Sequence, residues 1–334
     1  MKKQNIQRRS FLKRTSIIAG AAIAAPTALI SCSDDGSEDL ITPTLQYGQG
    51  DGFYRKKIGN KEITVISDGS LYFSNSFFAQ EADETSLNQL TASNGFSSDT
   101  TAVQVNAMVI KENDDITLID VGTSEGIYDT VGNFLRNFHK AGFKEKDVNR
   151  IILTHLHFDH FGYLFDKEGK AIFPNAEIIL SEKEYNFWND NTIDLSNINV
   201  DQGTKDFFIN SAKTVITNMK NQFTVKRDGQ ELAPGLAMLE APGHTPGHFA
   251  IEGDGFVYLA DTFVHPWVHL PHPEWTSKVD VNPDAVRSSR KMILDKVATD
   301  NLLVAGSHTN FPGFGRILKN GNGYDWKSTP FEWK

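Results

Sequence analysis

The nine residues from Thr154 to Gly162 constrain this chain more than any other segment. They place three imidazoles and a carboxylate within six positions, in the pattern H-x-H-x-D-H from His155 to His160. The apolar run Val148–Leu153 comes directly before them and predicts a short buried strand. Because a rigid strand fixes the loop that follows it, several side chains of that loop can converge on one point at little further entropic cost. The segment therefore predicts a metal site at the end of a strand.

The spacing of this cluster also suggests a second metal. In an extended chain His155, His157 and Asp159 would share one face, whereas a bend at this point would let Asp159 and His160 serve a second ion. Each ion needs further ligands, since zinc usually takes about three or four protein groups and keeps one position for water. Three downstream residues, each in a tight turn or just past an apolar run, offer them: His244, Asp261 and His308.

This order of motifs resembles the metallo-β-lactamase superfamily, whose binuclear hydrolases carry H-x-H-x-D-H followed by His, Asp and His. The resemblance implies a fold of the α-β-β-α sandwich type, with two packed mixed β-sheets and helices outside. Periodicity alone predicts only a mixture of α and β structure. The resemblance further implies these roles: His155, His157 and His244 hold the first metal; Asp159, His160 and His308 hold the second; Asp261 bridges the two; Asp120 orients a ligating imidazole.

Within that superfamily the sequence resembles the branch of methyl parathion hydrolase, from about Gly52 to the C-terminus. The strings GFYRKKIGNKEITVISDG, FPNAEIILSEKEYNFW, PGHTPGH and SHTNFPGFGRI carry the likeness in the same order. It implies an aromatic wall around the substrate, with Trp188, Tyr128, Phe207 and Phe208 as candidates. The chain departs from that branch after Asp261, where His265 stands in a loop expected to border the pocket. Lactones and aryl esters therefore stay open as substrates beside phosphotriesters.

The chemistry that such a site supports is ester hydrolysis. Water bound to a metal of this kind has its pKa lowered to roughly 7, so no serine or cysteine nucleophile is required. Asp159 or Asp261 could relay the proton to the leaving group. The leading hypothesis is a binuclear hydrolase of phosphotriesters, lactones or aryl esters. Zinc is the first candidate metal, and manganese, cobalt and iron also accept histidine and carboxylate ligands.

Two alternatives to this hypothesis stay open. One is a β-lactamase, although its best-known subclass places a cysteine in the second metal site and Cys32 is the only cysteine of this chain. The other is a cell-surface binding lipoprotein of the same fold that does no chemistry. Metal content would discriminate the second alternative from an enzyme.

The first 32 residues predict an export signal. They carry six basic residues and no acid, and an apolar, alanine-rich run follows from Ile17 to Ile30. The string RRSFLK resembles a twin-arginine signal, and LISC resembles a lipobox in which Cys32 is lipidated, although a plain cleavable leader with a chance cysteine stays open. Residues 33–50 predict an acidic, flexible tether, which leaves 51–334 for one hydrolase domain. The protein is thus expected to be exported, as a periplasmic, outer-membrane or cell-surface lipoprotein that meets the membrane only through Cys32.

The charge of the chain restricts its partners. Removing the leader takes six of the 33 basic residues and leaves 27 against 42 acidic ones, a net charge near −15. Such a surface repels phosphate backbones, which argues against nucleic acid and leaves a small-molecule ester as the expected partner. A homodimer is a further possibility if the aromatic residues Phe73, Phe77 and Phe78 are exposed.

The remaining pattern predicts a β-rich opening followed by alternating elements. A Ser181–Glu184 capping box predicts the start of a helix that carries Trp188. His248, His265, His269 and His272 are expected to be structural or exposed rather than catalytic, and His139 to face solvent. Strands are expected at Glu62–Ser67, Val103–Ile110 and Ile116–Ile119, and helices at Ile127–Ala141 (closed by Gly142), Thr204–Lys220 and Pro283–Ala298.

Overall fold

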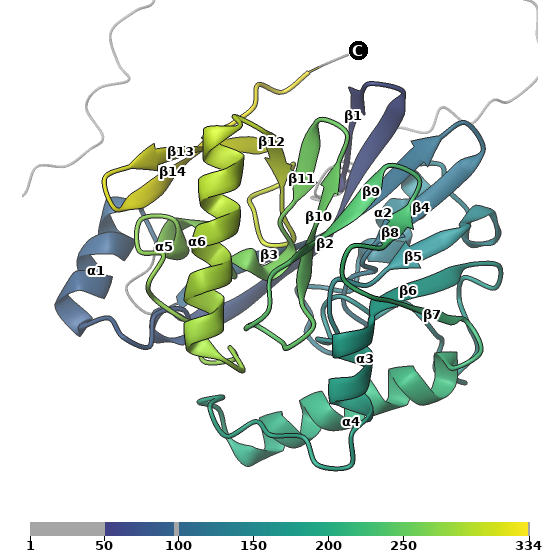
Figure 1. The fold of residues 1–334 in the computed structure, drawn as a ribbon, viewed down its shortest axis with the longest axis horizontal. Coiled ribbons are helices and arrows are strands. Elements are labelled where there is room, and N and C mark those ends of the chain that lie inside the picture. Colours follow the sequence, from purple (N-terminus) through teal and green to yellow (C-terminus); the bar gives the residue numbers. More distant parts are fainter. Residues whose placement is uncertain (1–50, 97–99, 333–334) are drawn as a thin grey trace, which may run out of the picture. The chain divides into compact units, whose positions relative to one another are not determined.

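A computed structural model describes residues 51–96 and 100–332 of the chain. The expected leader, its lipobox cysteine Cys32 and the tether at 33–50 lie outside the described residues and stay predictions. Across the described ranges, every helix is too short or too polar to cross a bilayer. These residues form two seven-stranded sheets with helices on their outer faces, which confirms the predicted sandwich (Figure 1).

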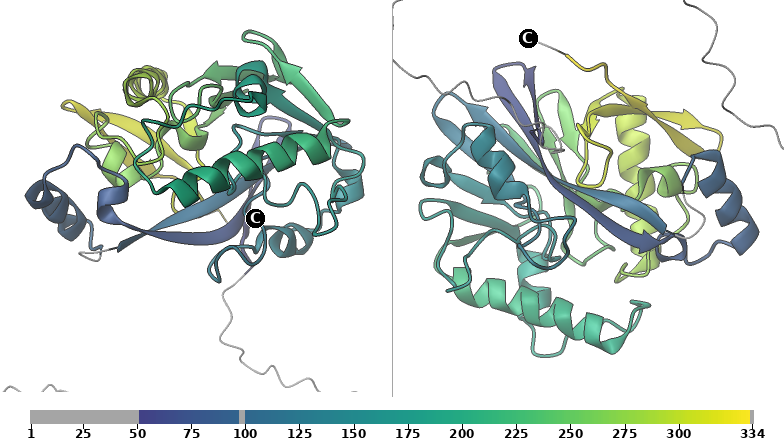
Figure 2. Two further views of the ribbon diagram at one scale, coloured as in Figure 1. Left: turned by 90° about the horizontal axis from the view of Figure 1, so that it is seen from below. Right: turned by 180° about the vertical axis from the view of Figure 1, so that it is seen from behind.

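The first sheet has the strand order β1 to β7, in the order of the chain. Its first four strands pair antiparallel, and β4 to β7 pair parallel. The long strands β2 and β3 run together across the fold toward α1 (Glu84–Ser93) (Figure 2). The strand bounds are β1 Phe53–Ile58, β2 Lys61–Ser74, β3 Thr100–Glu112, β4 Asp115–Ile119, β5 Arg150–Ile152, β6 Glu177–Ser181 and β7 Phe223–Lys226.

The second sheet holds the C-terminal half of the strands, in the order β14 to β8. All of its pairs are antiparallel except β11 with β12, between which the chain crosses over through α6 (Pro283–Thr299). The strand bounds are β8 Glu231–Ala233, β9 Leu236–Glu240, β10 Phe249–Gly253, β11 Phe256–Tyr258, β12 Leu303–Ala305, β13 Gly315–Asn320 and β14 Gly323–Ser328.

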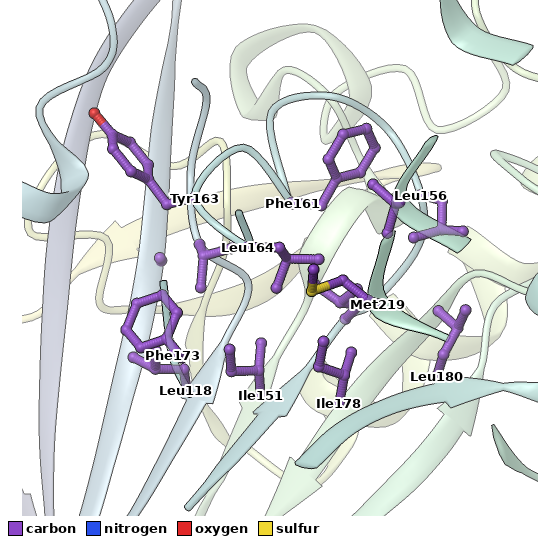
Figure 3. Packing of buried hydrophobic residues seen from close by; sticks show 14 of the residues in the cluster. Leu118, Ile151, Leu156, Phe161, Tyr163, Leu164, Phe173, Ile178, Leu180 and Met219 are labelled. Atoms are coloured by element: carbon purple, nitrogen blue, oxygen red, sulfur yellow. The ribbon is translucent and has the colours of Figure 1, made fainter. Parts of the chain in front are cut away.

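Successive side chains of a strand point to opposite faces of the sheet, so the first sheet contributes to two cores. Leu118, Ile151 and Ile178 lie in register on neighbouring strands and face the helices, where Figure 3 shows them opposite Leu164 and Met219. The residue after each of them, Ile119, Ile152 and Ile179, faces the second sheet instead. A third core lies between the second sheet and α6. The order of layers is therefore helices, sheet, sheet, helix.

The helices lie mainly outside the sheets. Residues of α4 pack in the same core as the first sheet, and α6 packs against the second (Figure 1). Asp83, Ser181, Asp201 and Asn282 each cap a helix through the side chain, as their residue types favour. The helix bounds are α1 Glu84–Ser93, α2 Phe134–Lys140, α3 Glu182–Asn189, α4 Gln202–Met219, α5 Pro266–His269 and α6 Pro283–Thr299.

One predicted helix is half wrong. The pattern predicted a helix from Ile127 to Ala141, but α2 begins only at Phe134. Gly126 and Gly132 have φ of 82° and 89°, a region that interrupts a helix, and the side chain of Asp68 accepts the Phe134 N–H at 2.7 Å. The segment before α2 is therefore a loop, and Gly142 follows the helix with φ of 86°, as predicted. The other predicted strands and helices are confirmed within a few residues, apart from β2 and β3, which are longer than predicted.

Candidate metal centre

Seven predicted ligands meet where the two sheets end. Four of them follow β5 of the first sheet, and three follow β9, β11 and β12 of the second. Their exposed fractions are at most 8%, so the polar side chains lie away from bulk water. These residues are His155, His157, Asp159, His160, His244, Asp261 and His308.

The first ligand group consists of His155, His157 and His244. Nε2 of His155 lies 3.0 Å from Nδ1 of His157, which lies 2.9 Å from Nε2 of His244. Nitrogens bound tetrahedrally to one zinc at about 2.0–2.1 Å would be about 3.3 Å apart, close to these spacings. The three nitrogens therefore face a common point and could hold one cation.

The second ligand group consists of Asp159, His160 and His308. Oδ2 of Asp159 lies 3.6 Å from Nε2 of His160 and 3.7 Å from Nε2 of His308. These atoms could hold a second cation.

Asp261 lies between the two groups. Its Oδ1 is 3.3 Å from Nε2 of His160, and its Oδ2 is 3.0 Å from Nε2 of His308 and 3.4 Å from Nε2 of His244. One carboxylate oxygen thus faces only the second group, while the other faces both. This placement suits a bridging ligand.

The remaining nitrogen of each of four imidazoles is held by a neighbour. Nδ1 of His160 pairs with Asp120 at 2.9 Å, as the sequence suggested, and Asp120 has a φ of 59°, which few residues other than Gly, Asn and Asp adopt. Nδ1 of His308 donates to the backbone carbonyl of Gln104 at 2.7 Å, and Nδ1 of His155 lies 3.1 Å from Thr154 Oγ1. Such contacts fix the tautomer and direct Nε2 toward a metal.

The fourth contact comes from Asp280, which sequence reasoning missed. Its Oδ1 lies 2.7 Å from Nδ1 of His244, and its Oδ2 accepts the backbone N–H of Ser277 at 2.7 Å. Asp280 stands in a loop 36 residues from His244. No periodic pattern or fixed spacing in the sequence connects the two residues, so only the folded chain identifies this pair.

His248 lies beside the ligands but has no free nitrogen. Its Nδ1 donates to the carbonyl of Ala241 at 2.9 Å, and its Nε2 accepts the backbone N–H of Asp261 at 3.0 Å. Burial lowers the pKa of His248 to about 4, so the ring is neutral. His248 could join a third group with His155 and Asp261 by distance alone, but both of its nitrogens already fix the backbone next to the ligands.

The charges of the cluster call for cations. Burial would lower the pKa of His160, but the carboxylates of Asp261, Asp159 and Asp120 raise it to about 10. Burial and the adjacent imidazoles lower the pKa of His155 and His157 well below the usual value. Four carboxylates, those of Asp120, Asp159, Asp261 and Asp280, lie buried among these rings. Two divalent cations would match their charge.

Unsatisfied atoms at the same place support this fit. Buried polar atoms are normally hydrogen-bonded. Within the described residues, Nε2 of His160, Oδ1 of Asp261 and Nε2 of His157 are buried without a hydrogen-bond partner. The first two lie 3.3 Å apart and both face the cluster. A bound cation would satisfy both atoms.

A cavity of about 520 Å³ opens onto the ligands. His157, Asp159, His244, Asp261 and His308 form its polar end. The rest of the wall is mainly apolar. It comes from β2, the 3-10 helix Asn75–Phe77, β3, the loop after β5, α4 and the loops before α2, α5 and α6. Its apolar members are Leu71, Phe73, Phe77, Val103, Ile127, Tyr128, Phe158, Phe207, Phe208, Val264 and Val279.

Two predicted pocket residues do not line this cavity. Trp188 is fully buried behind the ligands, with its ring centroid 6.2 Å from that of His157 and its Nε1 donating to Glu184. His265 is buried between the rings of Phe78 and Phe96, and its neighbour Val264 reaches the cavity instead. Tyr128, Phe207 and Phe208 do line it. The sequence could not distinguish a ring that supports a ligand from one that contacts the cavity.

The remaining expectations concern the other histidines and the aromatic residues Phe73, Phe77 and Phe78. His139 is exposed, as predicted. His269 is fully buried with its Nε2 2.7 Å from the carbonyl oxygen of Phe78, which agrees with the predicted structural role. Phe78 is also fully buried, and Phe73 and Phe77 line the cavity. These three rings therefore do not form the exposed dimer surface that the sequence suggested, and a homodimer stays a prediction.

Comparison with known proteins finds a family profile that spans all seven ligand residues. Residues 100–308 match the profile of the Metallo-beta-lactamase superfamily. N-acyl homoserine lactonases of Bacillus sp and Bacillus cereus are each 28% identical over 120 and 124 residues, 36% of this chain and 37% and 40% of theirs. The chain thus spans well under half the length of these lactonases.

Two solved structures are similar over a longer range. AidC, a dizinc quorum-quenching lactonase in complex with a product, N-hexanoyl-L-homoserine, has a TM-score of 0.80 at 27% identity, covering 84% of this chain and 98% of that one. The hydrolase AbOPH of the beta lactamase superfamily has a TM-score of 0.75 at 24% identity, covering 85% and 100%. At that identity the second likeness shows the fold alone.

Proposed function

Because the chain belongs to the metallo-beta-lactamase superfamily, we propose that it is a binuclear metal-dependent hydrolase of lactones or related activated esters. The observation that carries the proposal is the pair of ligand groups joined by Asp261 at the end of a mainly apolar cavity. The lactonase relatives and the similarity to a dizinc lactonase support both the reaction and zinc as the metal.

Each residue of the cluster has a role in this proposal. His155, His157 and His244 would hold one zinc, Asp159, His160 and His308 the other, and Asp261 both. When bound, the two ions would supply an activated water and would polarise the carbonyl of the substrate. Asp120 and Asp280 keep the imidazoles of His160 and His244 oriented for this task.

Asp159 is the proposed proton carrier. Its carboxylate lies on the cavity wall and is no closer than 3.6 Å to the imidazoles of its group, whereas Asp261 is tied more tightly. Hydrolysis adds a water oxygen to the carbonyl carbon and breaks the ester C–O bond, and the leaving oxygen then needs a proton. Asp159, with Asp261 as the alternative, would accept the proton of the water and donate it to that oxygen.

The cavity wall supports an uncharged substrate with an apolar arm. The volume of the cavity lies within the range of small-molecule sites. Side chains such as Phe77, Phe208 and Val279 would contact an acyl chain beyond the polar end. Phosphotriesters with an aryl leaving group are the second candidate, favoured by the resemblance to methyl parathion hydrolase. The rings of Phe73 and Phe77 stack on each other along the cavity wall and could pack against such a group.

Two other readings have less support. A β-lactamase would use the same metals, but the second ligand group contains no cysteine. A binding lipoprotein without chemistry would not need a metal. We also propose that the chain is exported and lipidated at Cys32, on the strength of its RRSFLK and LISC strings.

The test is to purify the chain from Gly36 onward, determine bound metal by elemental analysis, and assay four substrates. The panel is an N-acyl homoserine lactone, an aryl acetate, methyl parathion and nitrocefin. About two metals per chain with lactone or aryl-ester turnover would support the proposal, and dominant methyl parathion or nitrocefin turnover would select an alternative. Asp159→Ala should bind metal at the first group but lose most turnover. Absence of both metal and activity after reconstitution with metal would refute the proposed enzymatic function.

A further inference from the structure

Glu184 is a fully buried carboxylate near the start of α3 that accepts four hydrogen bonds. Its Oε1 accepts the backbone N–H of Leu156 at 2.9 Å and the indole N–H of Trp188 at 2.7 Å. Its Oε2 accepts the hydroxyl of Thr245 at 2.7 Å and the backbone N–H of Gly247 at 3.0 Å. Three separate segments of the chain thus donate to one carboxylate.

The partners of Glu184 are the neighbours of the first ligand group. Leu156 stands between His155 and His157, and Thr245 directly follows His244. These two segments are far apart in sequence. The ring nitrogens of His155, His157 and His244 nevertheless lie at about the spacing that binding to one zinc requires. The Glu184 carboxylate is a side-chain bridge that joins the two segments at residues directly next to the ligands in sequence.

The packing around α3 brings Glu184 to this place. Ser181 Oγ accepts the N–H of Glu184 at 3.1 Å and donates to the carbonyl of Gly247 at 2.7 Å. A Cβ on Gly247 would lie 2.1 Å from the Glu184 nitrogen, so only glycine allows this approach. The predicted capping box is therefore half formed. The Glu184 side chain, which would usually return to the backbone of Ser181, reaches the two ligand segments instead.

The burial of Glu184 also calls for a reason. A buried carboxylate is costly unless it is paired or fully hydrogen-bonded, and none of the described ion pairs involves Glu184. All four of its partners are hydrogen-bond donors that belong to the ligand segments or to Trp188, which packs behind His157. The carboxylate is thus committed to the organisation of this region.

We propose that Glu184 is a positioning residue that sets the spacing of His155 and His157 against His244, and so the metal affinity of the first ligand group. The inference rests on the proposed function, in which that group holds a zinc. The second ligand group depends less on Glu184, because the carboxylate makes no hydrogen bond to Asp159, His160 or His308 or to the residues directly beside His308, which follows β12.

The test is Glu184→Gln in the purified protein. The variant keeps the shape of the side chain but replaces one acceptor oxygen by an NH2 group, which is a donor. That NH2 group must face either the N–H groups of Leu156 and Trp188 or the N–H group of Gly247, so at least one hydrogen bond is lost. Metal-free protein is titrated with Zn²⁺ against a chromophoric chelator, and with Co²⁺ while the absorption bands of each site are followed. We expect the affinity of one site to fall by about tenfold or more and that of the other to stay unchanged.

Asp68→Asn is the matched control. Asp68 is likewise buried and accepts the backbone N–H groups of Thr123 and Phe134, but neither of these residues adjoins a ligand. Both zinc affinities should match the wild type in this variant. If Asp68→Asn weakens one site as much as Glu184→Gln does, or if Glu184→Gln weakens both sites equally, the positioning role is refuted.

Other outcomes separate this inference from the proposed function. Wild-type protein that binds no metal refutes the function, whereas two metals bound equally by wild type and Glu184→Gln refute only the role of Glu184. Should Glu184→Gln fail to fold, Thr245→Val removes a single donor from the same carboxylate. That variant should weaken the same site by a smaller factor, and unchanged affinity would count against the inference.

Discussion

Asp280 accepts a hydrogen bond from Nδ1 of His244 at 2.7 Å, and both side chains are almost fully buried. The contact leaves Nε2 of His244 as the free nitrogen that faces His157 and Asp261. The carboxylate also stabilises a ring that would carry partial positive charge on a metal. His160 has the same arrangement with Asp120, so each ligand group contains one imidazole held by an aspartate.

Replacement of Asp280 should therefore weaken metal binding without removing a ligand. In Asp280→Ala the tautomer and orientation of His244 are no longer fixed, and we expect the affinity of the first ligand group to fall by about 10- to 100-fold. Competition with a chelator measures this. Asp280→Asn keeps an acceptor oxygen and should lose less. Equal loss in the two variants would show that charge matters and orientation does not.

Removal of metal should destabilise the protein. Ions that bind only the folded chain add stability by mass action, about 4 kcal/mol when free metal exceeds Kd roughly 1,000-fold. Dialysis against a chelator should abolish turnover and lower Tm, and stoichiometric zinc should restore both. A Tm that is the same with and without metal would contradict binding of metal by the folded cluster.

The stability of the fold should depend on pH through Asp68. Burial raises the pKa of Asp68 from 3.8 to about 6, so between these values the folded chain binds more protons than the unfolded chain. The contribution of Asp68 is then fully present below about pH 4 and is lost as pH rises through about 6. Tyr163, whose pKa burial and the charges of Asp68 and Glu125 raise, stays neutral throughout. Asp68→Asn should flatten the slope of unfolding free energy between pH 4 and 6, as measured by urea denaturation.

The cavity wall can be tested at Ile127, which lines the cavity and is 39% exposed, so that a polar residue is tolerated there. Ile127→Glu should lower kcat/KM for long-chain N-acyl lactones by about tenfold, roughly 1.4 kcal/mol, and change short-chain substrates little. Met292→Glu is the control, since Met292 is exposed on α6 outside the cavity. A uniform loss across chain lengths would place the acyl arm elsewhere.

Export and lipidation can be tested on the full-length chain. Cys32→Ser removes the cysteine of the LISC string, so the protein should move from the membrane fraction to the soluble fraction of the cells. Metabolic labelling with a radioactive fatty acid should mark the wild type only. Labelled Cys32→Ser protein would contradict lipidation at this residue.

Much of the fold and of the ligand cluster could be predicted from the sequence, because local signals coincide with the structure there. The run before His155 is a strand, and the H-x-H-x-D-H residues do converge. Asp120 lies where the resemblance put it. The loop before α2 was misjudged because its apolar residues have helical spacing but face the cavity, as Ile127 does.

The residues that organise the ligands were harder to find. Asp280 contacts His244 across 36 residues of sequence, and Glu184 contacts Thr245 across 61. A single sequence contains no signal for such long-range contacts. Glu184 was identified only as part of a capping box, and Trp188 only as an aromatic of the pocket. Both are explained by tertiary contacts that override the local pattern.

The division of the ligands between the two sheets has a further consequence. Strands β1 to β7 end at Lys226, β8 begins at Glu231, and the exposed turn between them is the single covalent link from one sheet to the other in the described chain. Each ligand group takes residues from both sides of that turn. The cations would thus act as a second, reversible link between the halves. A chain nicked in this turn should remain one particle while metal is bound and should come apart more readily once it is removed.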